Sequence, residues 1–392
     1  MNDHPRTWLM LGHKAGDNGQ LRALSEALGW PVIEKHLVYR KTEILTNLFA
    51  GPTLAGLVGE RSSPLEPPWP DLIISAGRRN EPLVRWIRKQ AGEKRVRLVH
   101  VGRPWALHEC FDLIITTPQY RLPDKPNILH NEAPLHRVNR GRLEEARKLW
   151  HGRLAHLPHP RIAVIMGGNA GPYDMDRENG ELLGHYANDL AARAQGSLMV
   201  TTSARTPSAA IDAFERHVDV PAVIYRWTPD ATDNPYMGFL AHADRLIVTC
   251  DSMSMLAEAC ETGRPVMIFD LLRGEGSNRP PLPADGSIRP RSFAETLRGL
   301  SLRPFFYKLG MTVGPSRLTR DVSIIHRNQV AAGRASWLGS ADTGDVTASP
   351  PPIRDLERAA DAVRALFADP PPPFPDPPGS ILPEWLQRFV QG

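Results

Sequence analysis

Cysteine is scarce in this chain, and no long run of apolar residues interrupts it. Its 392 residues include three cysteines, Cys110, Cys250 and Cys260, and none forms a Cys-x-x-Cys pair. This scarcity argues against a disulfide framework and favours a reduced, cytoplasmic protein. No segment approaches the ~20 apolar residues that span a bilayer, and the N-terminal MNDHPRTWLML lacks the features of a signal peptide. We therefore expect a cytoplasmic chain, and leave open a peripheral contact with the inner face of the membrane.

The sequence motifs of several enzyme classes are also missing. Without Gly-x-Gly-x-x-Gly or a Walker lysine, neither dinucleotide binding nor P-loop chemistry is supported, and a nicotinamide oxidoreductase is disfavoured. Without a Gly-x-Ser-x-Gly elbow, a serine hydrolase is disfavoured. No suitable loop carries Asp-x-Asp and no His/Cys cluster occurs, so we expect neither a metal nor another cofactor.

The composition is that of a soluble globular protein with a mild excess of positive charge. Apolar residues make up 41% of the chain and charged residues 23%, with a net charge of +4 and a pI near 9.0. This excess fits an ordinary solvated surface or attraction to an anionic partner, such as a phosphorylated substrate or an acidic membrane face. No nucleic-acid-binding motif accompanies the charge, so we expect no nucleic acid partner.

Apolar strands alternate with helical segments along most of the chain, a pattern typical of parallel α/β sheets. The length suits two domains. We predict an N-terminal Rossmann-like domain at 1–140, a linker helix at 141–160, and a C-terminal Rossmann-like domain at 161–350. A C-terminal helix and proline-rich tail at 351–392 are expected to pack back onto the surface.

Two loops of the second half are candidates for binding a phosphate, because each follows a predicted strand. In MGGNAGPY, Gly167, Gly168 and Asn169 let backbone amides approach a phosphate closely; a simple tight turn is the alternative. In TTSARTPS, Arg205 can clasp a phosphate with two nitrogens, or lie on the surface near a helix cap.

A third loop lies in RLIVTCDSMSMLAEACETGRPVMIFDL. Asp251 or Ser252 is expected to cap a helix, and Ser252 and Ser254 can hold an anion at its N-terminus. Glu258 lies farther along that helix among small apolar residues, where a carboxylate can accept two ribose hydroxyls. A solvent-facing glutamate is the alternative. Gly263 is expected to end the helix with a positive φ.

The three loops together resemble the donor half of two-domain GT-B glycosyltransferases. This resemblance implies an α/β fold of two Rossmann-like domains facing each other across a cleft. The C-terminal domain would lie on the nucleotide-sugar side and the N-terminal domain on the acceptor side, and the nucleotide-sugar would be the donor substrate.

A second resemblance rests on motifs in a fixed order: KAGDNGQ, ISAGRR, TTSARTP, an NPY segment, VTCDSMSM and TGRPV. In these the chain is similar to bacterial relatives of the plant mitochondrial-fission "elongated mitochondria" family. The family implies a GT-B-like fold, and in its plant branch the recruitment of a dynamin-like protein to mitochondria. The chain departs from the family pattern at VHVGRPW and at Gln119 and Tyr120, where His-Asp is expected.

The first half supplies candidates for catalysis and acceptor binding. An inverting transferase needs one base to remove the proton of the acceptor hydroxyl, and Asp17 or His13 can serve; each is otherwise a turn or capping residue. Lys14, Arg78 and Arg79 are candidates for binding an acidic or phosphorylated acceptor, with a surface ion-pair role as the alternative.

Two functions follow. The first is a metal-independent glycosyltransferase that binds a nucleotide-sugar and acts on a cell-envelope or lipid-linked acceptor. The alternative is a non-catalytic adaptor of the mitochondrial-fission type that binds a protein or membrane partner.

Overall fold

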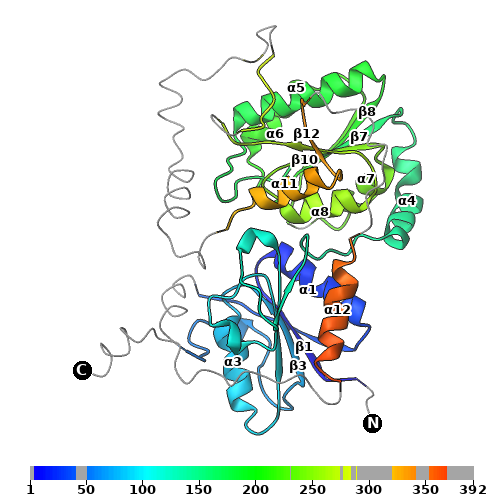
Figure 1. The fold of residues 1–392 in the computed structure, drawn as a ribbon. Coiled ribbons are helices and arrows are strands. Elements are labelled where there is room, and N and C mark those ends of the chain that lie inside the picture. Colours follow the sequence, from blue (N-terminus) through cyan, green and yellow to red (C-terminus); the bar gives the residue numbers. More distant parts are fainter. Residues whose placement is uncertain are drawn as a thin grey trace. The chain divides into compact units, whose positions relative to one another are not determined.

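The structure, a computed structural model, describes residues 4–40, 51–229, 231–273, 277–283, 288, 320–340 and 353–368. Its contacts divide the chain into two compact units. Unit 1 comprises Met1–Arg137, Ser316–Arg320 and Ile353–Gly392, and unit 2 comprises Val138–Pro315 and Asp321–Pro352. Each unit is built on a six-stranded sheet of parallel strands (Figure 1).

The sheet of unit 1 has the strand order β2-β1-β3-β4-β5-β6. Its strands are β1 (Thr7–Leu11), β2 (Val32–His36), β3 (Leu72–Ala76), β4 (Arg97–Val101), β5 (Leu113–Thr116) and β6 (Ile128–His130). Its helices are α1 (Ala15–Leu28), α3 (Glu81–Gln90), α12 (Asp355–Ala365) and the short 3-10 turns η1 (Gly59–Arg61), η2 (His108–Cys110) and η3 (Pro118–Tyr120).

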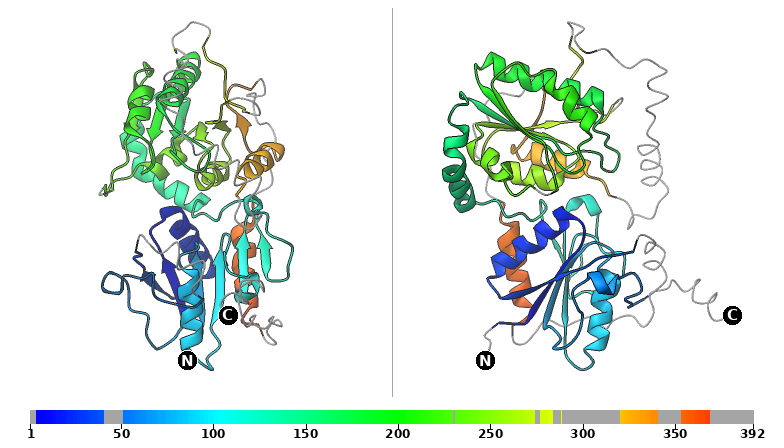
Figure 2. Two further views of the ribbon diagram at one scale, coloured as in Figure 1. Left: turned by 90° about the vertical axis from the view of Figure 1, so that its left-hand side faces the viewer. Right: turned by 180° about the vertical axis from the view of Figure 1, so that it is seen from behind.

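Both faces of this sheet are buried. Successive side chains of a strand point to opposite faces, so a strand that is apolar throughout contributes to an apolar cluster on each face. On β1, Leu9 and Leu11 join the apolar cluster formed with α1 and α12, whereas Trp8 and Met10 join the cluster formed with α3. A continuous apolar strand therefore needs helices on both faces, and Figure 2 shows them there.

Residues Asp355–Ala365 form the helix α12, which packs on α1 of unit 1. Arg364 donates a hydrogen bond of 2.7 Å to the carbonyl of Ala27, and the rings of Trp30 and Phe367 meet edge to face at 5.6 Å. At its start, the Asp355 carboxylate accepts bonds from two backbone amides that follow β6. The proline-rich segment 369–379, the final ILPEWLQRFV and the short helix expected at SFAETLRGL lie outside the described residues.

The sheet of unit 2 has the order β12-β11-β10-β7-β8-β9. Its strands are β7 (Arg161–Ile165), β8 (Ser197–Thr201), β9 (Ala222–Tyr225), β10 (Arg245–Thr249), β11 (Val266–Phe269) and β12 (Ser336–Trp337). Its helices are α4 (Arg140–Leu154), α5 (Arg177–Arg193), α6 (Ser208–Glu215), α7 (Tyr236–His242), α8 (Met253–Glu261) and α11 (Ser323–Ala331).

Helices also cover both faces of this second sheet, with α5 and α6 on one face and α8 and α11 on the other (Figure 1). The helix α4 packs on α7, where Arg147 donates to the carbonyl of Ala241. The two units confirm the predicted α/β class and the two Rossmann-like domains. We call unit 1 the first domain and unit 2 the second domain.

Candidate functional site

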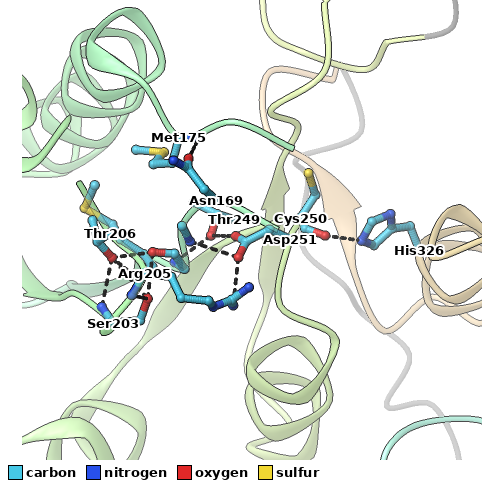
Figure 3. A network of polar contacts seen from close by, with 12 residues as sticks. Asn169, Met175, Ser203, Arg205, Thr206, Thr249, Cys250, Asp251 and His326 are labelled. Carbon is cyan, nitrogen blue, oxygen red and sulfur yellow. Dashed lines mark hydrogen bonds and ion pairs between the residues drawn. The ribbon is translucent and has the colours of Figure 1, made fainter. Parts of the chain in front are cut away.

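The strand order of the second domain reverses between β7 and β10. From β7 the chain passes through α5 to β8 on one side, while β10 pairs with β7 on the other. Open parallel sheets bind ligands at such a reversal, outside the carboxyl ends of their strands. The three loops expected to bind the donor follow β7, β8 and β10, and the fold brings them together at this edge (Figure 3).

Asp251 joins these three loops. Its buried carboxylate accepts hydrogen bonds from the Gly168 amide at 2.9 Å, the Thr249 hydroxyl at 2.7 Å and the Arg205 guanidinium at 3.0 Å. Burial raises the pKa of the Asp251 carboxyl, and the Arg205 charge opposes that rise. Of the two residues expected to cap α8, Ser252 occupies the N-cap position, and Asp251 acts as the link between the loops.

The loop after β7 packs tightly against its neighbours. The amides of Gly167, Gly168 and Asn169 donate to Thr249, Asp251 and the Arg205 carbonyl, respectively. A Cβ atom on Gly167 would overlap the Asp251 carboxylate, and one on Gly168 would overlap the Arg205 carbonyl. The amides are thus committed within the protein, as in the tight-turn alternative, and their contact with a phosphate stays a prediction.

Arg205 is held in place at one end of its guanidinium. Its Nη2 donates to Asp251, whereas Nε and Nη1 have no partner among the described residues, and 42% of the side chain is exposed. The turn that carries it is fixed by Ser203, whose hydroxyl donates to the Gly167 carbonyl at 2.8 Å. An arginine anchored in this way presents its free edge in a fixed direction, which suits an anion.

The helix α8 begins beside this arginine. Ser252 makes no side-chain capping bond, and both Ser252 and Ser254 are partly exposed. The first amides of a helix lack partners within it and attract anions. Ser254 and Glu258 are four residues apart and therefore lie on the same face of the helix. At its other end, Gly263 has a φ of 66°, which confirms the predicted positive φ.

Glu258 has a partner that we did not predict. The hydroxyl of Tyr236, the first residue of α7, donates a short hydrogen bond to Glu258 Oε2. Burial raises the pKa of Glu258 to about 7, and the Tyr236 hydroxyl works against that rise. Tyr236 belongs to the NPY segment, so the contact joins that segment to the helix that carries Glu258.

The first domain has a cavity of about 440 Å³ at the edge of its sheet that is formed by the carboxyl ends of the strands. Its strand order reverses between β1 and β3, and the cavity is lined by residues that follow β1, β3, β4, β5 and β6. The residues expected to act in catalysis and acceptor binding all line it: His13, Lys14, Asp17, Arg78 and Arg79. The fold therefore brings them together, while their roles stay predictions.

The two candidate bases differ in their surroundings. The ring nitrogens of His13 lie 3.3 and 3.4 Å from Arg79 Nη1. Burial lowers the pKa of His13, and Arg79 lowers it further, so the neutral imidazole predominates at neutral pH. Asp17 lies 3.9 Å from the Lys14 ammonium, and 34% of its side chain is exposed. Each offers an acceptor atom at the cavity wall.

Several lining residues were not among the predicted site residues. One is the last residue of β5, four lie in the loops after β4, β5 and β6, and one precedes α11: Thr116, Arg103, Gln119, Tyr120, Asn131 and Arg320. Gln119 and Tyr120 did carry a signal, because they are departures from the pattern of the resembling family. Arg320 follows Gln119 by about two hundred residues, and its Nε donates to Gln119 Oε1 at 2.7 Å.

A buried carboxylate holds one wall of this cavity. Glu81, at the start of α3, accepts bonds from the amides of Trp105 and Ala106 at 2.7 to 3.0 Å. These bonds fix the loop that also carries Arg103. Burial raises the pKa of Glu81 to about 7, against the lowering effect of the two amides.

This pKa predicts a pH-dependent stability that Glu81→Gln removes. The carboxyl ionises near 4.5 in the unfolded chain and near 7 in the folded one, so the unfolded state alone loses the proton between these values and the wild type is destabilised as pH rises. We expect the variant to gain on the order of 3 kcal/mol relative to wild type across this window. Above pH 7 the difference in unfolding free energy between the variant and the wild type no longer changes with pH. Thermal unfolding over a pH series measures this, with the exposed Glu93→Gln as control; a difference independent of pH would contradict it.

Neither a metal centre nor a membrane helix is found within the described ranges. No group of three or more His, Cys, Asp or Glu residues there is arranged to hold a metal ion. Among the helices that the structure describes, none combines the length and apolarity needed to cross a bilayer.

The family model for mitochondrial fission ELM1 matches residues 15–296 of the chain, a range that includes parts of both domains. The chain belongs to this family. The match confirms the resemblance to the "elongated mitochondria" proteins. The Arabidopsis thaliana mitochondrial fission protein ELM1 is 27% identical over 237 residues, covering 54% of this chain and 54% of that protein. An uncharacterised protein of Rickettsia prowazekii (strain Madrid E) is 26% identical over 230 residues, covering 51% and 64%. The match thus spans less than two thirds of either relative.

Solved structures of low sequence identity also superpose on most of the chain. The Staphylococcus aureus MnaA–UDP structure aligns with a TM-score of 0.44 and 10% identity, covering 93% of this chain and 96% of that one. The Neisseria meningitidis UDP-GlcNAc 2-epimerase, bound to UDP-GlcNAc, aligns at 0.43 and 10% over 92% and 99%. The Escherichia coli ADP-heptose heptosyltransferase II aligns at 0.38 and 12% over 67% and 84%. At these scores the likeness bears on neither ligand nor activity.

Proposed function

We propose that this ELM1-family chain binds a nucleotide-sugar in its second domain and transfers the sugar, without a metal, to a cell-envelope or lipid-linked acceptor. The observation that carries the proposal is the anchored arginine beside the helix α8. Arg205 keeps one nitrogen on the buried Asp251 and turns the other side of its guanidinium outward. A diphosphate can bridge this free edge and the first amides of α8.

The spacing along α8 suits the rest of a nucleotide. Glu258 lies four residues beyond Ser254, about 6 Å along the helix axis, on the same face. A phosphate held at Ser252 and Ser254 would therefore place a ribose within reach of the Glu258 carboxylate. Tyr236 occupies one carboxylate oxygen and fixes its direction, which leaves the other oxygen for sugar hydroxyls.

Nucleotide binding tests this arrangement. We expect at least one of UDP, GDP, ADP and CMP to raise the thermal midpoint of the protein and to bind in calorimetry. Glu258→Ala should weaken that binding about ten- to a hundredfold, because hydrogen bonds to a charged acceptor are worth about 1.5–3 kcal/mol. Glu258→Gln should be milder, since the amide still accepts one hydroxyl.

Glu261→Ala, three residues farther along the same helix, is the matched control and should leave the affinity unchanged. Circular dichroism verifies that each variant is folded. If no nucleotide binds the wild type, the proposal fails; if binding survives Glu258→Ala unchanged, Glu258 is not part of the site.

The family membership favours a second candidate, a non-catalytic adaptor that binds a protein or membrane partner. A curated relative carries the name of a mitochondrial fission protein. The two candidates differ in what Glu258→Ala does. An enzyme loses its function with the nucleotide site, whereas an adaptor keeps its partner binding.

A further inference from the structure

We propose that the cavity of the first domain binds a small polyanion, a phosphate or diphosphate ester. The cationic side chains that line the cavity would hold its negative charges, and two buried, uncharged polar side chains would hydrogen-bond to the rest of the ligand. This inference goes beyond the nucleotide site of the second domain and rests on the first domain alone. Its three supports are the charge of the lining, the bracing of the arginines and two buried polar side chains.

The charge of the lining is strongly one-sided. Among the described lining residues there is one carboxylate, Asp17, against five cationic side chains: Lys14, Arg78, Arg79, Arg103 and Arg320. Positive charges gathered around one cavity produce a positive potential there, which attracts anions. The volume of about 440 Å³ is that of a small-molecule site. The lining therefore suits a compact ligand with two or more negative charges.

Aromatic rings hold three of the arginines in position. The guanidinium of Arg78 lies 4.6 Å from the ring centre of Trp105. Those of Arg103 and Arg320 lie 5.4 and 5.8 Å from the ring centre of Tyr120. Stacking on a ring fixes the plane of a guanidinium group, and therefore the directions in which its N–H donors point. Gln119 adds a hydrogen bond that orients Arg320. These three arginines are thus held in position without a ligand.

Two buried polar side chains line the same cavity without a partner. Asn131 is 2% exposed and Thr116 is 1% exposed. Within the described residues, neither amide atom of Asn131 nor the Thr116 hydroxyl has a hydrogen-bond partner. Buried polar groups are normally paired, and leaving them unpaired is costly. A ligand that carries hydroxyl or amide groups beside its phosphate would satisfy them, which a bare inorganic ion does only in part.

The test is calorimetric titration of the full chain with inorganic pyrophosphate. We expect saturable binding that weakens at least about tenfold in Arg103→Gln, which removes a cation, and in Asn131→Asp, which adds a negative charge with almost no change of shape. Lys94→Gln removes a cation of the same domain that pairs with Asp71 and does not line the cavity, and it should bind as wild type does. Arg103 is partly exposed, so its variant keeps the test valid if Asn131→Asp does not fold.

Two results would overturn the inference: no saturable pyrophosphate binding, or equal affinities in wild type and both cavity variants. A second arm distinguishes a free ester from a lipid headgroup. Co-sedimentation with phosphatidylcholine vesicles that contain phosphatidic acid, abolished by pyrophosphate and by Asn131→Asp, indicates a headgroup; pyrophosphate binding without co-sedimentation indicates a soluble ester. Because a diphosphate can also bind at Arg205, the titration is repeated in Arg205→Gln, which should keep the pyrophosphate binding that depends on Arg103 and Asn131. Asn131→Asp should leave nucleotide affinity unchanged, so the two sites can fail separately.

Discussion

Gly168→Ala is expected to destabilise the second domain by about 3 kcal/mol or more, which corresponds to a fall of roughly 10 °C in its thermal midpoint. The added methyl group would overlap the backbone carbonyl of Arg205. Backbone cannot rotate away as a flexible side chain can, so the loops after β7 and β8 must separate. That separation breaks the bond from the Gly168 amide to Asp251 and moves the anchored arginine.

The matched control for this substitution is Gly152→Ala in α4 of the same domain. No atom lies within 4 Å of the position that its Cβ would take. Since alanine is the better helix former, this variant should be as stable as wild type or more stable, by up to about 1 kcal/mol. Thermal and denaturant unfolding compare the two. A Gly168→Ala protein as stable as wild type would show that the loops are not packed as described.

The sequence predicts the strands of the second domain and the meeting of its three loops well. Runs such as RIAVI and RLIVT are almost wholly apolar, as strands buried on both faces must be, and β7 and β10 are found at these residues. Because parallel strands end at one edge, the loops after them could be expected to converge. The sequence also predicts that β1 is followed by a helix, α1, and that this helix ends at Gly29.

Edge strands are harder to predict from sequence. The strand β2 reads VIEKH and is partly exposed on both faces, so it lacks the apolar run that marks the central strands. The strand β6 has three residues. Short or half-exposed strands are recruited by pairing with a neighbour already in the sheet, and that pairing leaves no mark on their own composition.

The contacts that shape the two sites depend on long-range geometry. Asp251 meets Gly168 only because β10 lies beside β7, and local sequence does not specify that order. Likewise Arg320 reaches Gln119 although the two are far apart in the chain. Residue types at strand ends thus indicated where the sites lie, whereas the partner of each side chain follows from the strand order.

Asp251 is the residue on which the donor-side loops depend most. Its side chain is fully buried, and its three donors come from three different segments. Removing the carboxylate leaves the Gly168 amide and the Thr249 hydroxyl buried without an acceptor, at about 1–3 kcal/mol each. Arg205 is partly exposed, so water compensates part of its loss.

Asp251→Ala is therefore expected to lower the free energy of unfolding by about 3–5 kcal/mol. Asp251→Asn should cost less, because the amide oxygen still accepts one bond, yet it removes the charge that anchors Arg205. Its nucleotide affinity should fall even where the protein is folded. Asp212→Asn, which loosens an exposed ion pair with Arg226, is the control and should change stability by less than about 1 kcal/mol. Denaturant unfolding and calorimetry on the three variants decide the matter: if Asp251→Asn binds nucleotide as the wild type does, the anchored arginine does not serve the donor site.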